Sequence, residues 1–293
     1  MLGEIRGEVR FKEPLSFHTS LRIGGPADIF IVPQDVEDIR LALSFAEREQ
    51  LSLDVIGGGN NLLVSDRGVR GVVLKLEGCL GRAEFNGEEA VAGAGVSLSA
   101  LIREAAALNL GGIECLVGVP ATVGGAVAMN AGTPDGGIAD FISAVYFLYP
   151  DGTLGEFKPG AGSFSYRVFT APPGAVLIGA RLQLHRRPFA EIQKDIKQRL
   201  KQKKSTQPLA LASAGCVWQN PPGETATRLI EKVGLKGKRL NGAEISAKHA
   251  NFIVNRGGAA ATDIKALMQL ALERVKNHFG ITLEPEMKTL GEI

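Results

Sequence analysis

Three short segments of the chain carry side chains that could do acid, base or anion chemistry. They are Ser165-Tyr166-Arg167-Val168, Ala214-Gly215-Cys216-Val217 and Leu283-Glu284-Pro285-Glu286. A guanidinium offers a rigid fork of donors that suits a carboxylate, and a thiol, with an ordinary pKa of about 8.5, is a readier proton donor than a hydroxyl. A carboxyl group whose pKa is raised by burial can share a proton with an anion. On residue type alone, a surface arginine after a turn and a small buried cysteine explain Arg167 and Cys216 as well.

Two stretches rich in glycine are predicted to be loops that recognise a ligand by backbone rather than by side chains. One is GVPATVGGAVAMNAG at 118–132, and the other is GGGNNLLV at 57–64, directly after the strand-like residues 53–56. Glycine lets the chain take positive φ and come close to a ligand, and inward-turned amides form an anion-binding concavity. The two stretches therefore predict one large cofactor that contains phosphate. The alternative is a set of tight turns and close strand crossings.

The usual nucleotide and metal signatures do not fit this sequence. It contains no Gly-x-x-x-x-Gly-Lys-Ser/Thr, and Gly93-Ala94-Gly95 lacks the third glycine of the dinucleotide fingerprint. A P-loop kinase and a Rossmann domain are therefore excluded. The cysteines at 79, 115 and 216 are odd in number, far apart and not in metal-ligand spacing, so we expect neither a disulfide framework nor a metal site.

The composition excludes several classes of partner. The chain has 293 residues, 45% of them hydrophobic, with 33 Lys and Arg against 31 Asp and Glu. This balance gives no global field that would recruit nucleic acid or an anionic membrane. The first residues, MLGEIRGEVRFKEP, are charged where a signal peptide is apolar, and no apolar run of about 18 residues could span a bilayer. We expect a soluble, cytoplasmic protein.

The hydrophobic patterns predict an α+β protein. Helices are expected over 35–49, from Ser97 to the glycines at 111 and 112, and over 190–204, 225–233 and 263–278, the last capped by Thr262. Strands are expected over 28–32, 53–56, 71–76, 89–96, 144–150, 175–185, 215–220 and 251–255. The basic helix 190–204 is best explained as a solvated face. Changes of pattern predict three lobes, at 1–76, 77–187 and 188–293.

Taken in order, six segments resemble the UDP-N-acetylenolpyruvoylglucosamine reductase family, in its shorter class. They are residues 19–25 (TSLRIGG), the two glycine stretches, 165–167 (SYR), 214–221 (AGCVWQNP) and 283–286 (LEPE). The resemblance implies a two-lobed FAD-binding fold of the vanillyl-alcohol oxidase type and a third α+β lobe that binds substrate. It also implies non-covalent FAD as cofactor, NADPH as co-substrate and UDP-N-acetylenolpyruvoylglucosamine as substrate. A monomer is favoured.

The resemblance also implies roles for individual residues. Arg167 matches the arginine that faces the substrate carboxylate, Cys216 stands where the family usually has a proton-donating serine, and Glu286 matches the third catalytic residue. Phe169 departs from the serine usual at its position. Matches to substrate-binding positions are Tyr166, Lys204 and Asn220. Matches to the cofactor site are Gly57, Gly58, Gly59, Asn60, Asn61, Leu62, Gly118, Val119, Pro120, Ala121, Thr122, Gly124, Gly125, Ala126, Asn130, Ala131 and Gly132.

Other residues and two other functions stay open at this stage. Glu284, two residues before Glu286, is expected to be solvated. His249 is expected to be structural or a rim contact, and Trp218 and Phe252 are expected in the core. A flavin oxidase of the same fold would use oxygen in place of NADPH. A flavin-binding or nucleotide-sugar-binding protein without turnover is the non-catalytic alternative, since serine is replaced by Cys216.

Overall fold

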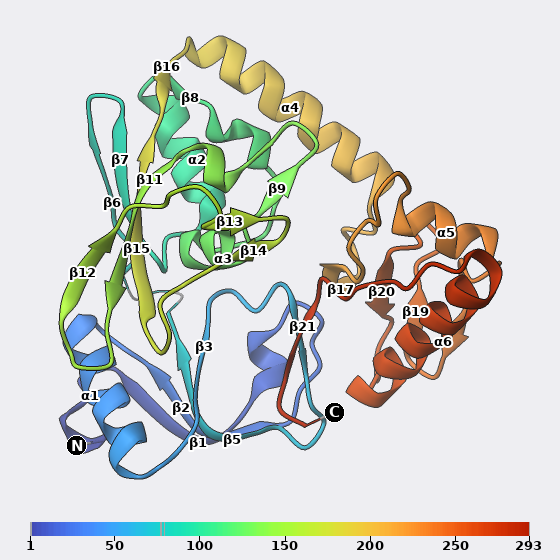
Figure 1. Ribbon diagram of the computed structural model, residues 1–293, viewed down its shortest axis with the longest axis horizontal. Coiled ribbons are helices and arrows are strands. Elements are labelled where there is room, and N and C mark those ends of the chain that lie inside the picture. Colours follow the sequence, from blue (N-terminus) through green and yellow to red (C-terminus); the bar gives the residue numbers. More distant parts are fainter. Residues whose placement is uncertain (1, 77, 79, 293) are drawn as a thin grey trace. The chain divides into compact units, whose positions relative to one another are not determined.

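The computed structural model describes residues 2–76, 78 and 80–292, which fold as two compact units (Figure 1). The first unit takes the chain up to Phe11, then Ile29–Gly58 and Gly71–Lys203, and the second takes Lys12–Asp28, Gly59–Arg70 and the chain from Lys204 on. The predicted lobe boundaries after residues 76 and 187 stay a prediction. Cys79, one of the three cysteines judged unsuited to a disulfide, lies outside the described residues.

The amino-terminal residues form a four-stranded sheet and one helix, and most of these residues belong to the first unit. The strand order is β1 (Glu8–Pro14), β2 (Pro26–Val32), β5 (Val69–Lys75) and β3 (Leu53–Ile56), with β3 parallel to β5. Helix α1 (Val36–Arg48) begins after Asp35, whose carboxylate accepts the backbone N–H groups of Glu37 and Asp38. Ile31, Ile39 and Leu74 form part of its core. The predicted helix and three strands of this region are confirmed.

The rest of the first unit is an antiparallel sheet with helices against it (Figure 1). Its order is β12 (Leu154–Phe157), β11 (Ile142–Leu148), β15 (Val176–Gln183), β7 (Glu89–Gly93) and β6 (Ala83–Asn86). Helix α2 (Leu98–Ala107) buries Leu98 and Leu101 in the core that also contains Val145 and Phe147 of β11. Short elements complete the unit: η1 (Leu2–Glu4), β8 (Leu110–Gly111), η3 (Ile113–Leu116), α3 (Val123–Ala128), β9 (Gly132–Thr133), β10 (Gly136–Gly137), η4 (Ile138–Asp140), β13 (Phe164–Ser165), β14 (Val168–Phe169) and β16 (His185–Arg186).

The basic helix predicted over 190–204 is present as α4 (Phe189–Thr206). It continues from the last residues of the first unit into the first residues of the second. Ile192 is buried, and most of the other side chains of α4 are exposed. The prediction of a solvated helix is confirmed.

The second unit has a four-stranded sheet with two helices beside it (Figure 1). The order is β17 (Ala212–Cys216), β20 (Phe252–Asn255), β19 (Ala243–Ile245) and β18 (Arg239–Leu240), with α5 (Ala226–Lys232) and α6 (Ala261–Phe279). Strand β21 (Lys288–Leu290) pairs in parallel with β4 (Leu62–Val64), and η2 (Leu15–His18) lies near the start of the unit. Leu229, Ile253 and Leu267 belong to its core.

Two predictions about this unit are wrong in their boundaries. The last helix begins at Ala261, before the predicted cap Thr262, because Asp66 accepts the N–H groups of Ala261 and Thr262 at 2.7 and 3.1 Å. This carboxylate comes from a distant segment, so no local signal marks it. Strand β17 ends at Cys216, earlier than the predicted 215–220. Within the described residues, no helix has the length and apolarity to cross a membrane.

Candidate functional site

The second glycine stretch, predicted as backbone loop, contains a short helix. Thr122 caps α3, its Oγ1 accepting the N–H of Gly125 at 3.2 Å. A Cβ at Gly124 would stand 2.9 Å from the Cβ of Ala94, so close packing requires glycine there. The helix forms despite its glycines because its flank packs directly on the sheet.

The two glycine stretches meet within the first unit. A Cβ at Gly57 would stand 2.5 Å from Oγ1 of Thr122, the capping hydroxyl of α3. No side chain fits at Gly57 unless this hydroxyl moves. The prediction that the two stretches form one site is therefore supported by their direct approach at this point.

The first stretch continues into the second unit at Gly59. Gly59 has φ of 63°, and a Cβ there would stand 1.9 Å from the carbonyl oxygen of His18. Its own carbonyl accepts the N–H of Ser20 at 3.1 Å. Glycine is required here both by the left-handed backbone and by the close approach of another segment.

Asn130, near the end of the second stretch, offers a polar atom for a ligand. Its Nδ2 donates to the carbonyl of Ser165 at 2.8 Å. Its Oδ1 is buried and accepts no hydrogen bond from the described residues. Buried polar atoms are nearly always bonded, so this acceptor suits a donor on a bound molecule. Together with the glycine backbone, it fits a polar cofactor such as FAD.

The remaining predicted cofactor contacts lie in the same two stretches. Most are half-buried, while Ala126 is buried in α3 and Pro120 is exposed. The half-buried ones are Gly58, Asn60, Asn61, Leu62, Gly118, Val119, Ala121, Ala131 and Gly132. Partial exposure leaves these residues within reach of a ligand.

Arg167 lies in the tight turn between β13 and β14, beside the second glycine stretch. Its φ is 60°, an uncommon conformation for a residue with a long side chain. The guanidinium carbon lies 5.1 Å from the ring centroid of Tyr166, which is 51% exposed. A Cβ at Gly132 would stand 3.4 Å from Nη1 of Arg167. The turn thus brings together three residues predicted for the site in the first unit.

Phe169, where the family resemblance leads one to expect serine, belongs to the core. It is 8% exposed, and its ring centroid lies 4.6 Å from that of Phe164 and 6.3 Å from that of Phe147. This departure therefore changes packing under the turn and adds no polar group to the site.

In the second unit, a β-bulge places Cys216 at the end of β17. Ser213 pairs with Val254 and Cys216 with Phe252, so one extra residue is accommodated in β17. Gly215 within the bulge has φ of 79°. A bulge bends a strand and redirects its side chains. Cys216 is half-buried at this redirected end.

Glu286 is bound directly to the segment that follows Cys216. Its N–H donates to the carbonyl of Val217 at 2.8 Å, and its carbonyl accepts Nδ2 of Asn61 at 3.0 Å. Glu286 is half-buried, whereas Glu284 is exposed, which confirms that Glu284 is solvated. The structure therefore brings together Cys216, Glu286 and Asn61. The sequence does not predict that the Asn61 side chain binds Glu286, because 225 residues separate the two.

Two residues that are predicted to bind the substrate also form hydrogen bonds within the protein. Oδ1 of Asn220 accepts the N–H of Ala226 at the start of α5, at 3.0 Å. Lys204 is exposed near the end of α4, and its carbonyl accepts Nζ of Lys248. Their positions in the second unit leave the Lys204 ammonium and the Asn220 amide nitrogen as possible ligand donors.

His249 and two aromatic residues behave as structural groups. The His249 ring meets Phe252 edge-on, with centroids 4.8 Å apart, and its Nδ1 lies 3.4 Å from Oγ1 of Thr227. Burial lowers the pKa of His249. Trp218 and Phe252 are 3% and 6% exposed, which confirms their prediction as core residues.

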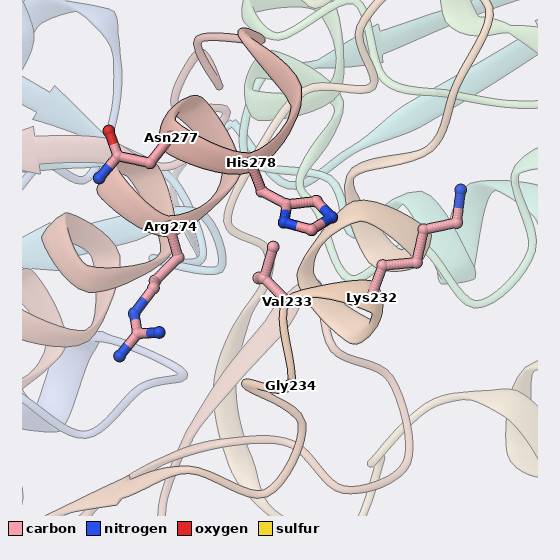
Figure 2. A pocket seen from close by; sticks show the side chains of 6 residues that line it. All are labelled: Lys232, Val233, Gly234, Arg274, Asn277 and His278. Carbon is pink, nitrogen blue, oxygen red and sulfur yellow. The ribbon is translucent and has the colours of Figure 1, made fainter.

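An open pocket is formed at the carboxyl ends of α5 and α6 (Figure 2). It is lined by Lys232, Val233, Gly234, Arg274, Asn277 and His278, none of which was predicted for the site. Lys232 lies 3.6 Å from a carboxylate oxygen of Glu224 and 5.6 Å from the ring centroid of Phe279. Cations at helix ends complement the helix dipole. No group of His, Cys, Asp and Glu in the part of the chain described could hold a metal ion.

Two family models match successive parts of this chain. Residues 27–158 match the FAD binding domain, and residues 207–290 match the UDP-N-acetylenolpyruvoylglucosamine reductase C-terminal domain. A solved plant protein, a BBE-like protein of Physcomitrella patens, aligns over 93% of this chain and 59% of its own at a TM-score of 0.51. At 16% identity, that likeness shows the fold alone. The predicted α+β fold with an FAD-binding part is confirmed.

Relatives align over nearly the whole chain. UDP-N-acetylenolpyruvoylglucosamine reductase of Anaeromyxobacter sp. is 45% identical over 98% of this chain and 90% of its own. That of Moorella thermoacetica is 42% identical over 97% and 94%. The crystal structure of the Thermus caldophilus enzyme covers 98% of this chain and 100% of its own at 37% identity, with a TM-score of 0.84. From this breadth of similarity, the chain belongs to the UDP-N-acetylenolpyruvoylglucosamine reductase family.

Proposed function

We propose that this chain reduces the enolpyruvyl ether of UDP-N-acetylenolpyruvoylglucosamine to UDP-N-acetylmuramate, in the cytoplasm, as a step of peptidoglycan precursor synthesis. NADPH is the reductant, and the protein acts as a monomer. The observation that carries the proposal is the backbone hydrogen bond at 2.8 Å from the N–H of Glu286 to the carbonyl of Val217, which joins the segment of Glu286 to the residue that follows Cys216. A proton donor and a proton-sharing group are the parts that this reduction requires beyond hydride transfer.

The cofactor is held without a covalent bond. Neither glycine stretch contains a histidine or cysteine of the kind expected for a covalent flavin link. The backbone at Gly57 and around Thr122, together with the buried Oδ1 of Asn130, offers polar contacts to FAD. We assign residues 1–76 and 77–187 to the two FAD-binding lobes and 188–293 to the substrate lobe.

Three side chains have different roles in the reaction of the substrate. FAD, when bound and reduced by NADPH, would supply the hydride that adds to C3 of the enolpyruvyl group. The Arg167 guanidinium binds the substrate carboxylate, where negative charge grows as C3 accepts the hydride. The Cys216 thiol gives a proton to C2 and regains one from solvent, so one hydride and one proton saturate the double bond. Glu286, protonated, shares its proton with the carboxylate and so stabilises the anion.

Residues outside this centre hold the rest of the substrate. Lys204 pairs with the diphosphate as a point charge, and Tyr166 and Asn220 bind the remainder of the nucleotide sugar. The exposure of Tyr166 and Lys204 supports these contacts, because both side chains are accessible to a ligand.

Anaerobic half-reactions test the proposed function and its two alternatives. The purified protein is expected to be yellow, to bleach when NADPH is added without oxygen, and to regain its colour when the enolpyruvyl substrate follows. An oxidase would bleach with an alcohol or hydroxy acid and recover with oxygen. A binding protein without turnover would stay yellow throughout, which would refute the proposal.

A pair of glutamates gives a matched test of the site assignment. Glu286→Gln should slow flavin reoxidation by the enolpyruvyl substrate by about 10²-fold or more, because it removes the shared proton. Glu284→Gln, an identical change two residues away at an exposed position, should leave that rate within about twofold. Equal rates for the two variants would remove Glu286 from the proposed chemistry.

A further inference from the structure

The side chain of Asn251 makes the two hydrogen bonds that the backbone of a neighbouring strand would make. Its Oδ1 accepts the N–H of Trp218 at 2.9 Å, and its Nδ2 donates to the carbonyl of the same residue at 2.8 Å. Asn251 is 2% exposed. The pair of bonds is that of two facing residues in an antiparallel sheet.

The same residue also holds Val217. The backbone carbonyl of Asn251 accepts the N–H of Val217 at 2.8 Å, and the carbonyl of Val217 accepts the N–H of Glu286 at 2.8 Å. Cys216 directly precedes Val217. One buried residue therefore fixes the segment that carries the thiol on one side and binds the glutamate on the other.

The position of the bulge explains why a side chain is needed. Strand pairing between β17 and β20 ends at Cys216 and Phe252, so this ladder gives Trp218 no partner. Trp218 forms an isolated bridge with Pro285, but the hydrogen bonds of that bridge use the polar groups of Val217 and Gln219 and not those of Trp218. Trp218 is 3% exposed, so water does not supply hydrogen-bond partners for its backbone N–H and carbonyl groups. Asn251 replaces the missing strand, and it does so with an amide that cannot ionise.

We infer that Asn251 is a positioning residue for proton delivery: it sets the place of the Cys216 thiol relative to the Glu286 carboxyl group. This inference rests on the proposed function. A displacement of about 1 Å at reacting groups can cost on the order of 10²-fold in rate. The effect of losing Asn251 should therefore fall on the reaction with the enolpyruvyl substrate and leave the reaction with NADPH intact.

The test uses the flavin-loaded full-length protein and measures the two half-reactions separately. Asn251→Ala should slow reoxidation by the enolpyruvyl substrate by about 10²-fold and keep flavin reduction by NADPH within about twofold. Cys216→Ala should then cost much less in the Asn251→Ala background than in the wild type, because the thiol is already displaced. Asn241→Ala is the matched control, since it loses an asparagine bond to Asp263 at 2.6 Å outside this segment. It should leave both half-reactions unchanged.

A second variant covers the case in which Asn251→Ala does not fold. In Asn251→Asp, an ionised carboxylate would face the Trp218 carbonyl, whereas a protonated carboxyl group has the shape and donor pattern of the amide. Reoxidation by the enolpyruvyl substrate, relative to wild type at each pH, should therefore recover as the pH falls. If Asn251 only stabilised the fold, the recovery at low pH would appear in both half-reactions and not in reoxidation alone.

The outcomes separate this inference from the function on which it rests. If Cys216→Ala and Glu286→Gln both reoxidise at the wild-type rate, the proposed roles fail and the inference fails with them. If those variants are slow, but Asn251→Ala adds independently to Cys216→Ala or slows both half-reactions equally, the positioning role alone is overturned. Absence of acid recovery in Asn251→Asp would overturn it as well.

Discussion

The second glycine stretch in the first unit and the Cys216–Glu286 region in the second are held in place by different means. The stretch at 118–132 combines a local cap, in which Thr122 accepts the N–H of Gly125, with backbone hydrogen bonds from Val123 and Gly124 to Val96 and Ala94. The residues around Cys216 are fixed by partners 33 and 225 positions away in the chain, Asn251 with Trp218 and Asn61 with Glu286. The cradle is thus held by backbone hydrogen bonds and one local side-chain cap, whereas the segments that carry the two acid groups are held by side chains from distant positions.

This difference has a consequence for substitution. In the first region, adding any side chain at Gly57 forces Thr122 to move. In the second, loss of a partner leaves a buried backbone group without its hydrogen bond, at a typical cost of about 1–3 kcal/mol. Cofactor retention should therefore respond to changes in the first region, and proton delivery to changes in the second.

The largest effect is expected at Cys216. Cys216→Ala should slow flavin reoxidation by the enolpyruvyl substrate by about 10²–10⁴-fold, the usual loss when a general acid is removed. Flavin content and reduction by NADPH should stay near the wild-type values. Rapid-mixing absorbance under anaerobic conditions measures both steps.

Cys216→Ser sharpens this prediction, because it restores a hydroxyl donor in the same place. Much of the lost rate should return, and peroxide should inactivate the wild type while sparing the serine variant, since only a thiol is oxidised stepwise. If Cys216→Ala reoxidises as fast as the wild type, water or another group donates the proton.

Arg167→Lys should have the next largest effect, on the order of 10²-fold in reoxidation by the enolpyruvyl substrate. A lysine keeps the charge but cannot make two parallel bonds to a carboxylate. It also keeps a Cβ, so the backbone strain at φ of 60° is the same in both proteins. Equal slowing of both half-reactions would show that Arg167 does not act on the substrate carboxylate.

Gly57→Ala should weaken FAD binding by about tenfold or more without a specific effect on proton delivery. The added methyl group displaces Oγ1 of Thr122 and so disturbs the cap of α3. Flavin released on dilution, measured by its fluorescence, gives the affinity. Gly160→Ala is the control, because a Cβ there meets nothing within 4 Å. Similar flavin loss in both variants would refute a cradle at Gly57.

Regular elements and local caps were predictable from sequence, because their causes are local. Asp35 marks the start of α1 and Thr225 the start of α5, as side chains that accept nearby N–H groups. Alternating and helical patterns located most strands and helices for the same reason. The similarity to a known family then located Arg167, Cys216 and Glu286, which residue types alone left ambiguous.

What the sequence could not predict depends on contacts between distant segments. Nothing near α6 indicates that Asp66 caps it, and nothing near Trp218 indicates that Asn251 replaces a strand. The glycines at 124 and 125 disfavour a helix, so the sequence predicts a loop where the structure has α3. Packing of Gly124 on Ala94 overrides that propensity.

The smallest effect on turnover is expected at Asp38, whose carboxylate holds backbone of the first unit. Asp38 is fully buried and accepts the N–H groups of Arg6, Gly7 and Gln34 at 3.0, 2.8 and 2.8 Å. Burial acts to raise its pKa, but these three bonds and the charge of Arg6 outweigh it, so the pKa is lowered. A lowered folded-state pKa means that the carboxylate stabilises the fold above its unfolded pKa near 3.9 and that this contribution is lost as the pH falls through the folded-state value.

Asp38→Asn should therefore lower the free energy of unfolding at pH 7 by about 1–3 kcal/mol, because an amide has one acceptor oxygen for three donors. The difference from wild type should shrink on acidification through the folded-state pKa, as urea denaturation at several pH values can show. Asp35→Asn, a change at an exposed helix cap where asparagine serves equally well, should cost only a few tenths of a kcal/mol. Turnover per folded molecule should be unchanged in both variants. If Asp38→Asn slowed reoxidation by the enolpyruvyl substrate while stability held, distant side-chain bonds in the first unit would also set the chemistry, and the contrast between the two regions would fail.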